Sequence, residues 1–224
     1  MFYKPMVKTF IITPGIFLGV LFSQTFSEST PVHTYSIVAF DEETGELGVA
    51  VQSHWFSVGF LVPWAKAGVG AVATQSFVKV DYGPEGLNRM EHGQSAEEAL
   101  NSLLAEDEGE AVRQVAMIDV KGSVAAHTGT KCIYAAGHQI GKNYSVQANL
   151  MEKETVWPSM ANAFERSNGD LAEKMMAALE AAEAEGGDIR GKQSAAMLIV
   201  SGNPTGIPWK DVVMDIRVDD HAEP

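Results

Sequence analysis

Residues 34–53 read TYSIVAFDEETGELGVAVQS, and this stretch decides the fold of the chain. Two β-rich runs, 34–41 and 47–53, flank a short acidic connection that contains a glycine. Paired runs around such a turn predict a β-hairpin. Both runs are apolar almost throughout, which predicts strands buried on both faces. If the hairpin is antiparallel, Thr34 at the start of the first strand lies beside Gln52 and Ser53 at the end of the second.

Beyond the hairpin, β-rich runs and amphipathic helices follow one another in blocks. Ser95 with Glu98, and Asp170 with Glu173, have the spacing of capping boxes that begin helices. Further helices are expected around 156–167 and from 170 to about 185. Strands are expected at 68–75, 114–119, 123–127, 195–200 and 212–218, and a strand or extended segment at 145–150. The order strands, helices, strands, helices, strands predicts an α+β architecture with sheets stacked between helix layers.

The composition is that of a globular protein with enough apolar material for one sizeable core. The chain has 224 residues, of which 46% are hydrophobic. Acidic residues outnumber basic ones by 29 to 16, for a net charge of −13, and no cluster of lysine or arginine occurs. Nucleic acid is therefore excluded as an expected partner. Cys132 is the single cysteine, so neither an internal disulfide nor a cysteine-pair metal site is expected.

Residues 1–30 have the character of an export segment. Lys4 and Lys8 precede a largely apolar run, Thr9–Phe22, and small polar residues follow it. This order is typical of a secretory signal peptide, and the run is short for a membrane span. An uncleaved membrane anchor is the alternative. We expect a protein exported to the periplasm or secreted, with a folded domain over residues 33–224.

Candidate functional residues are polar side chains at the ends of apolar strands. Thr34 begins the first strand, and hydroxyl and amide residues end the next ones at 52–53, 74–76 and 127–130. Hydroxyls and amides gathered at a sheet rim suit a nucleophile, its orienting partner and an oxyanion donor. The alternative is that these residues only end strands and cap turns. Metal ligands are too few for a metal site to be expected.

Residues 34–76 and 186–200 resemble an uncharacterised bacterial family placed in the N-terminal-nucleophile (Ntn) hydrolase superfamily. The resemblance covers essentially residues 33–221 and implies the four-layer αββα sandwich of that superfamily. It agrees with the order of strands and helices described above. It implies a fold more firmly than a reaction.

A more distant likeness, to the threonine-dependent asparaginases of the same superfamily, implies roles for particular residues. Those enzymes begin their catalytic chain with a threonine and an apolar strand, followed by a glycine turn and a strand that closes on a hydroxyl residue. The likeness places Thr34 as the nucleophile, Ser53 as the second hydroxyl and Thr74 as an oxyanion contact, with Gln75 where those enzymes have glycine. Substrate-binding candidates are Ser36, Gln52, Gln75, Ser76, His127 and Asn149.

The implied chemistry is hydrolysis of an amide bond in a small molecule or peptide, without a cofactor. The α-amine of Thr34 would act as the base, because its pKa of about 7.7–8.0 leaves it partly unprotonated near neutral pH. This requires cleavage between His33 and Thr34, and His33 is a poor site for signal peptidase, which prefers small side chains. Further trimming or self-cleavage would then be needed.

Two other functions stay open. The domain could be a non-catalytic binding or scaffold domain that keeps the fold, or a hydrolase that uses Ser53 with His54. A homo-oligomer is also plausible, because apolar and aromatic residues follow the second strand at 55–64.

Overall fold

The predicted hairpin is present in the computed structural model, which describes residues 31–32 and 34–224. Strands β2 (Thr34–Phe40) and β3 (Leu47–Ser53) pair antiparallel, with Thr34 opposite Ser53 and Phe40 opposite Leu47. The turn between them is held by the Asp41 carboxylate, which accepts the main-chain N–H groups of Glu43 and Thr44. The expected export segment, residues 1–30, lies outside the described residues.

The hairpin forms the centre of the larger of two antiparallel sheets. Its strand order is β11-β10-β3-β2-β9-β8, so β2 and β3 have a strand on either side. This position explains why both runs are apolar nearly throughout. The remaining strands of this sheet are β8 (Gly137–Gly141), β9 (Tyr144–Ala148), β10 (Ser194–Val200) and β11 (Val212–Val218).

The second sheet has five strands and is built around β5 (Gly70–Phe77). One edge of β5 pairs with β6 (Arg113–Asp119), which pairs in turn with β7 (Val124–Thr128). The other edge is shared by β4 (Pro63–Lys66), opposite residues 70–73, and β1 (Pro31–Val32), opposite residues 76–77. The chain therefore passes from this sheet to the larger one between β1 and β2.

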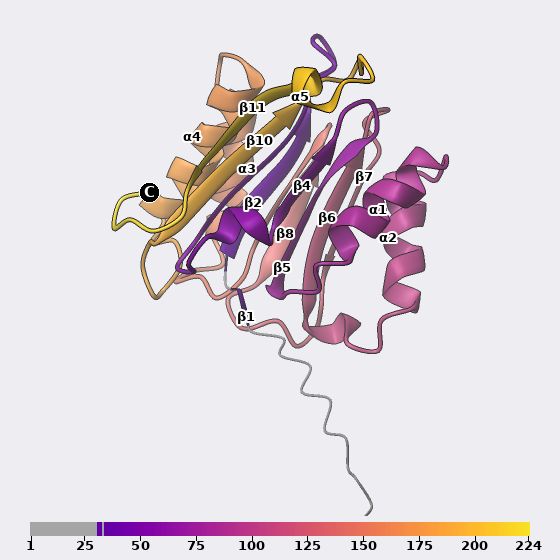
Figure 1. Cartoon of the computed structure of the whole chain (residues 1–224). Helices are drawn as coiled ribbons and strands as arrows, with labels where there is room; N and C mark the ends of the chain where they lie inside the picture. Colours follow the sequence, from indigo (N-terminus) through magenta and orange to yellow (C-terminus); the bar gives the residue numbers. More distant parts are fainter. Residues whose placement is uncertain (1–30, 33) are drawn as a thin grey trace, which may run out of the picture.

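Within the described residues, five α-helices accompany the sheets (Figure 1). The pair α1 (Tyr82–Glu91) and α2 (Ala96–Ala105) contacts β4 to β7, whereas α3 (Val156–Arg166) and α4 (Leu171–Ala184) contact β2, β3, β8 and β9. The short α5 (Pro208–Asp211) leads into β11. Both predicted capping boxes are present, at Ser95 with Glu98 and at Asp170 with Glu173. No helix of the described chain is long and apolar enough to cross a membrane.

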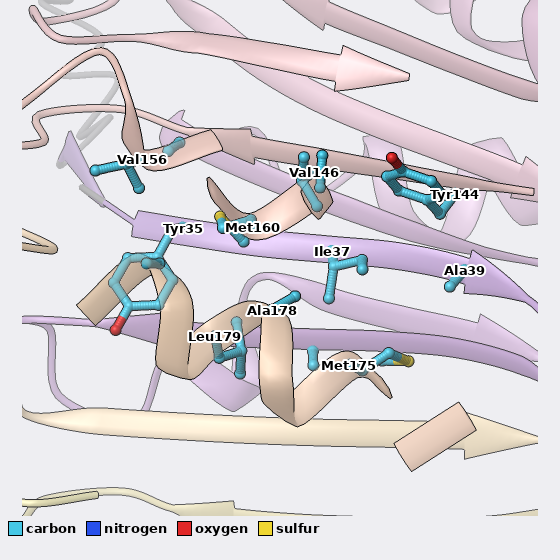
Figure 2. Close-up of a cluster of buried hydrophobic side chains, with 14 of the residues drawn as sticks. Tyr35, Ile37, Ala39, Tyr144, Val146, Val156, Met160, Met175, Ala178 and Leu179 are labelled. Atoms are coloured by element: carbon cyan, nitrogen blue, oxygen red, sulfur yellow. The ribbon is translucent and has the colours of Figure 1, made fainter. Parts of the chain in front are cut away.

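Alternate residues of the hairpin enter two different cores. Tyr35, Ile37 and Ala39 pack against α3 and α4 (Figure 2), whereas Val38 packs toward the second sheet. These side chains are almost completely buried, and each large one contributes about 1.5–3 kcal/mol of hydrophobic stabilisation. A third core lies between α1, α2 and the outer face of the smaller sheet.

Helix α1 and strands β4 and β8 were not predicted. The α1 sequence YGPEGLNRME contains two glycines and a proline, which oppose a helix assignment from sequence alone. Tertiary packing explains the helix: a Cβ atom on Gly83 would lie 2.3 Å from the ring of Trp64, and one on Gly86 would lie 2.7 Å from Met117. The glycines therefore allow α1 to lie close against the sheet.

A buried carboxylate, Asp107, joins the end of α2 to the smaller sheet. It accepts hydrogen bonds from Arg113 Nε at 2.9 Å, from the Gly109 main-chain N–H at 3.0 Å and from the Tyr82 hydroxyl at 3.1 Å. Burial alone would raise the pKa of Asp107, but the Arg113 guanidinium and the two other donors lower it below the ordinary value of 3.8. The ionised form is therefore the one that stabilises the fold.

We expect Asp107→Asn to lower the free energy of unfolding by about 2 kcal/mol at pH 7, because the Arg113 charge loses its buried partner. The folded pKa lies below the unfolded one, so this stabilisation is present above pH 3.8 and is lost as the pH falls through the folded pKa. Urea denaturation of both proteins from pH 7 to pH 2 measures the difference. The exposed Asp81, changed to Asn, is the control, and a difference independent of pH would contradict the ionic role.

Candidate functional site

The candidate site lies where β2 begins and β3 ends. Thr34, Ser53 and Ser194 stand opposite one another on β2, β3 and β10, which gives a row of three hydroxyls across the sheet. Thr34 Oγ1 donates to Ser53 Oγ at 3.2 Å, and both residues are completely buried. The expected pairing of these two hydroxyls is therefore present in the structure.

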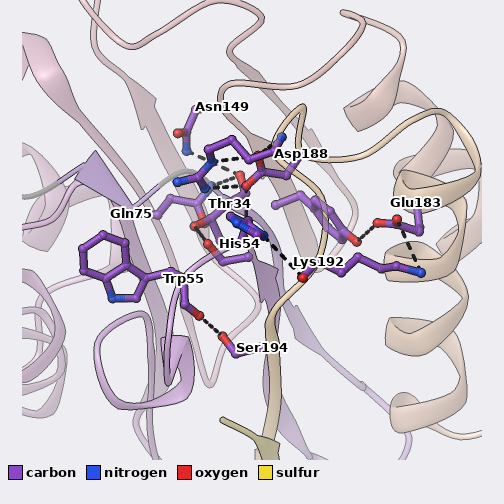
Figure 3. A network of polar contacts seen from close by, with 12 residues as sticks. Thr34, His54, Trp55, Gln75, Asn149, Glu183, Asp188, Lys192 and Ser194 are labelled. Carbon is purple, nitrogen blue, oxygen red and sulfur yellow. Dashed lines mark hydrogen bonds and ion pairs between the residues drawn. The ribbon is translucent and has the colours of Figure 1, made fainter. Parts of the chain in front are cut away.

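The main chain of Thr34 is held by amide donors from β5 and from the residue that follows β9 (Figure 3). Its carbonyl oxygen accepts the Asn149 main-chain N–H at 3.1 Å, Gln75 Nε2 at 3.2 Å and Asn149 Nδ2 at 3.4 Å. Gln75 belongs to the smaller sheet and Asn149 follows β9, so both sheets fix the position of Thr34. Such clamping keeps a side chain in one place, as a reactive group requires.

A buried hydrogen-bond network extends from Thr34 between the sheets. Ser36 Oγ donates to Gln75 Oε1 at 2.6 Å and accepts from Gln147 Nε2 at 2.6 Å. Gln114 Oε1 accepts from Gln75 Nε2 at 2.7 Å and from Asn149 Nδ2 at 2.9 Å. A buried amide without a partner costs about 1–3 kcal/mol, so the mutual pairing of these side chains is what permits their burial.

The network reaches the surface at Thr128 and His138. Gln114 Nε2 donates to Thr128 Oγ1 at 2.9 Å, and Thr128 Oγ1 lies 2.8 Å from His138 Nδ1. Burial, with the nearby His127, lowers the pKa of His138 and favours a neutral ring that accepts the Thr128 hydroxyl proton. Thr128 and His138 line an open groove of about 620 Å³, which Cys132, Tyr134 and Trp157 also line.

The loop before β10 closes the rim beside Ser53. The Gln193 main-chain N–H donates to Ser53 O at 3.1 Å, and the Asp188 carboxylate accepts the His54 main-chain N–H at 3.3 Å. Asp188 is buried and pairs with Arg190, whose Nη2 lies 2.5 Å from Asp188 Oδ2. The two residues thus form a structural ion pair beside the site.

Three of the predicted site residues point away from Thr34, which corrects their expected positions. Thr74 faces the helices of the smaller sheet, where Thr74 Oγ1 donates to Lys79 O at 3.2 Å and its N–H donates to Val62 O. His127 faces the same side and lies 2.9 Å from Glu110 O. Gln52 faces α4. The physical reason is strand periodicity: successive side chains of a strand point to opposite faces of the sheet, so a residue next to one that faces the space between the sheets faces away from it.

Two further expectations concern the immediate neighbours of the site. The His54 ring does not turn toward Ser53, because its Nδ1 lies 3.3 Å from Lys192 O. Ser76, the next-to-last residue of β5, has a left-handed backbone conformation, with φ 69°, and pairs with Val32 of β1. Cys132 is half-buried and donates to Arg113 O at 3.3 Å, and burial raises the pKa of its thiol. Its thiol is therefore protonated at neutral pH.

Gln114 and Gln147 belong to the site but were not predicted. The available signal was a polar residue at an inward-facing position of a strand, because Gln114 alternates with the buried Ala116 and Ile118. In the part of the chain that the structure describes, no group of three or more His, Cys, Asp or Glu residues could hold a metal ion.

We expect Gln114→Ala to lower the free energy of unfolding by about 3 kcal/mol, because Gln75 and Asn149 lose a buried acceptor and a cavity is left. Chemical denaturation measures the change. Gln193→Ala, which removes an exposed amide bonded to Asp220, should change stability by less than about 0.5 kcal/mol. A Gln114→Ala protein as stable as the control would show that the network does not hold the sheets together.

Comparison with known proteins supplies a family and shows similarity to solved structures. The crystal structure of protein SPO2555 from Silicibacter pomeroyi, described as a DUF1028 protein, matches with a TM-score of 0.74 and 30% sequence identity. The match covers 84% of this chain and 82% of that one. A search among curated proteins finds no match. The model of the family of unknown function DUF1028 matches residues 34–224, and the chain therefore belongs to this family.

Proposed function

We propose that the protein is an amidohydrolase of the Ntn type and that its two sheets and flanking helices form the αββα sandwich of that superfamily. The observation that carries this proposal is the hydroxyl pair of Thr34 and Ser53, 3.2 Å apart, with the Thr34 carbonyl clamped by Gln75 and Asn149. The family match begins at Thr34, which is consistent with a functional domain that starts there.

Thr34 needs a free α-amine for this chemistry, and in the intact chain its nitrogen belongs to a peptide bond. Strand β1 pairs with β5 just before Thr34, which is completely buried. We therefore propose self-cleavage. Thr34 Oγ1 attacks the carbonyl carbon of residue 33 and forms an ester, while the nitrogen leaves as the α-amine. Water then hydrolyses the ester, which frees the Thr34 hydroxyl and gives the released segment a carboxylate.

The mature site would then cleave an amide substrate, a small molecule or a peptide. Thr34 Oγ1 attacks the substrate carbonyl and its proton passes to the α-amine, which protonates the leaving amine. Water hydrolyses the resulting ester. Ser53 orients the Thr34 hydroxyl. Because Thr74 faces away, we assign oxyanion stabilisation to the Asn149 side-chain amide, which would exchange its long bond of 3.4 Å to the Thr34 carbonyl for one to the oxyanion.

A second candidate function is ligand binding without catalysis. The complete burial of Thr34 in the intact chain favours it, because an uncut chain gives a substrate no access to the hydroxyl. Whether the peptide bond before Thr34 is cleaved distinguishes the two functions.

We expect the protein purified from its native compartment to have lost both the export segment and the residues before Thr34. Intact-mass measurement and N-terminal sequencing should find Thr34 first. Thr34→Ala should leave the bond uncut, and Ser53→Ala should slow the cut by about ten-fold or more, because the attacking hydroxyl loses its partner. Thr44→Ala, in the exposed hairpin turn, is the control and should be cut like the wild type.

A β-lactone probe, which acylates nucleophilic hydroxyls, should label Thr34 in the cut protein, as peptide mapping would reveal. Labelling at Ser53 would instead favour the hydrolase that uses Ser53. An uncut protein that hydrolyses amides would contradict the proposed mechanism, and an uncut protein without labelling would favour the binding domain.

A further inference from the structure

A second cavity lies on the face of the larger sheet opposite to Thr34. Helix α4 contacts β2 and β3, and the cavity fills the space that remains between α4 and β11. Its volume is about 280 Å³, near the lower end for small-molecule pockets. Lining side chains include Gln52, Leu179, Ala195, Met197, Ile216 and Val218.

The small side chain of Ala195 leaves this space open. Gln52 on β3 stands opposite Ala195 on β10, which stands opposite Val218 on β11. The three residues form one row across the sheet on the α4 side. Because alanine fills little volume between them, the row has a gap that ends at the Gln52 amide.

Gln52 is a buried polar side chain without a partner inside the protein. It is 4% exposed, and neither Oε1 nor Nε2 has a hydrogen bond to any residue that the structure describes. By contrast, the buried amides between the sheets, such as Gln75 and Gln114, have hydrogen-bond partners at both the oxygen and the nitrogen. A buried amide without hydrogen bonds destabilises the free protein. Such amides are rare in folded proteins, and a bound molecule that supplies the missing hydrogen bonds would explain this one.

The surroundings define the chemistry of such a molecule. The walls are mainly aliphatic, and the charged side chains among the lining residues are two acidic and two basic ones, Glu180, Glu183, Lys192 and Arg217. The acidic and basic side chains largely neutralise each other's charge. Lys192 Nζ, for example, lies 3.8 Å from Glu183 Oε1, which Figure 3 shows. Glu183 also accepts the Tyr35 hydroxyl at 2.7 Å. No net charge is therefore offered to a ligand.

We propose that this cavity binds a neutral small molecule with an aliphatic body and a terminal carboxamide. The Gln52 amide offers one acceptor and one donor side by side, and a carboxamide presents the complementary pair. The aliphatic body packs between Leu179, Met197 and Ile216. The site is separate from the Thr34 site, because Gln52 and Ser53 point to opposite faces of β3.

The test uses the intact protein with carbon-13-labelled methionine methyl groups. Met176 and Met197 line the cavity, whereas the buried Met117 lies in the core of the other sheet and serves as the internal control. Isocaproamide should shift the Met176 and Met197 signals saturably and leave Met117 unmoved. Methyl isoamyl ketone, which has the same shape and lacks the N–H donors, should bind at least about ten-fold more weakly.

Two variants complete the test. Gln52→Met keeps the length of the side chain, and it should weaken isocaproamide binding at least about ten-fold while raising the denaturation midpoint of the free protein. Ala195→Leu fills the gap and should abolish binding, which covers the case in which Gln52→Met does not fold. Thr34→Ala should bind as the wild type does. Absence of saturable shifts, or equal binding by the amide, the ketone and Gln52→Met, would overturn the proposal.

Discussion

The side-chain amides of Gln75 and Gln114, joined to each other by a hydrogen bond of 2.7 Å, make the contacts on which the arrangement of the two sheets depends. Both residues belong to the smaller sheet and both extend to the main chain of the larger one, at Thr34 and Ala148. Apolar contacts between the sheets are not directional and would tolerate small shifts. Amide hydrogen bonds need particular distances and angles, so they set how the sheets lie on one another.

The space between the sheets therefore has two halves with different roles. The half beyond Val38 is apolar and supplies stability through burial. The half near the start of β2 is filled by hydroxyls and amides that satisfy one another. A polar interior of this kind contributes less net stability than aliphatic packing and gives positional accuracy instead, which is the property that the proposed nucleophile needs.

Much of the fold could be predicted because its signals are local. The two capping boxes begin α2 and α4 at the expected residues, and β-rich runs predicted the bounds of β3 and β11. The site could be predicted only in part. The hairpin register brings Thr34 and Ser53 together, but the side that Thr74 faces depends on how β5 lies across the other sheet. Helix α1 depends on contacts of Gly83 with Trp64, which are distant in sequence. No local pattern carries such information.

Strand β1 contributes two residues to an edge of β5 that β4 otherwise occupies. A pairing this short has almost no affinity of its own, and it persists because the chain holds it at high effective concentration. A cut between β1 and β2 removes that tether, so the released segment would diffuse away and would not compete for the site again. If the proposed cleavage occurs, the same short strand would make opening of the site a one-way event, controlled by a single covalent bond and not by a reversible equilibrium.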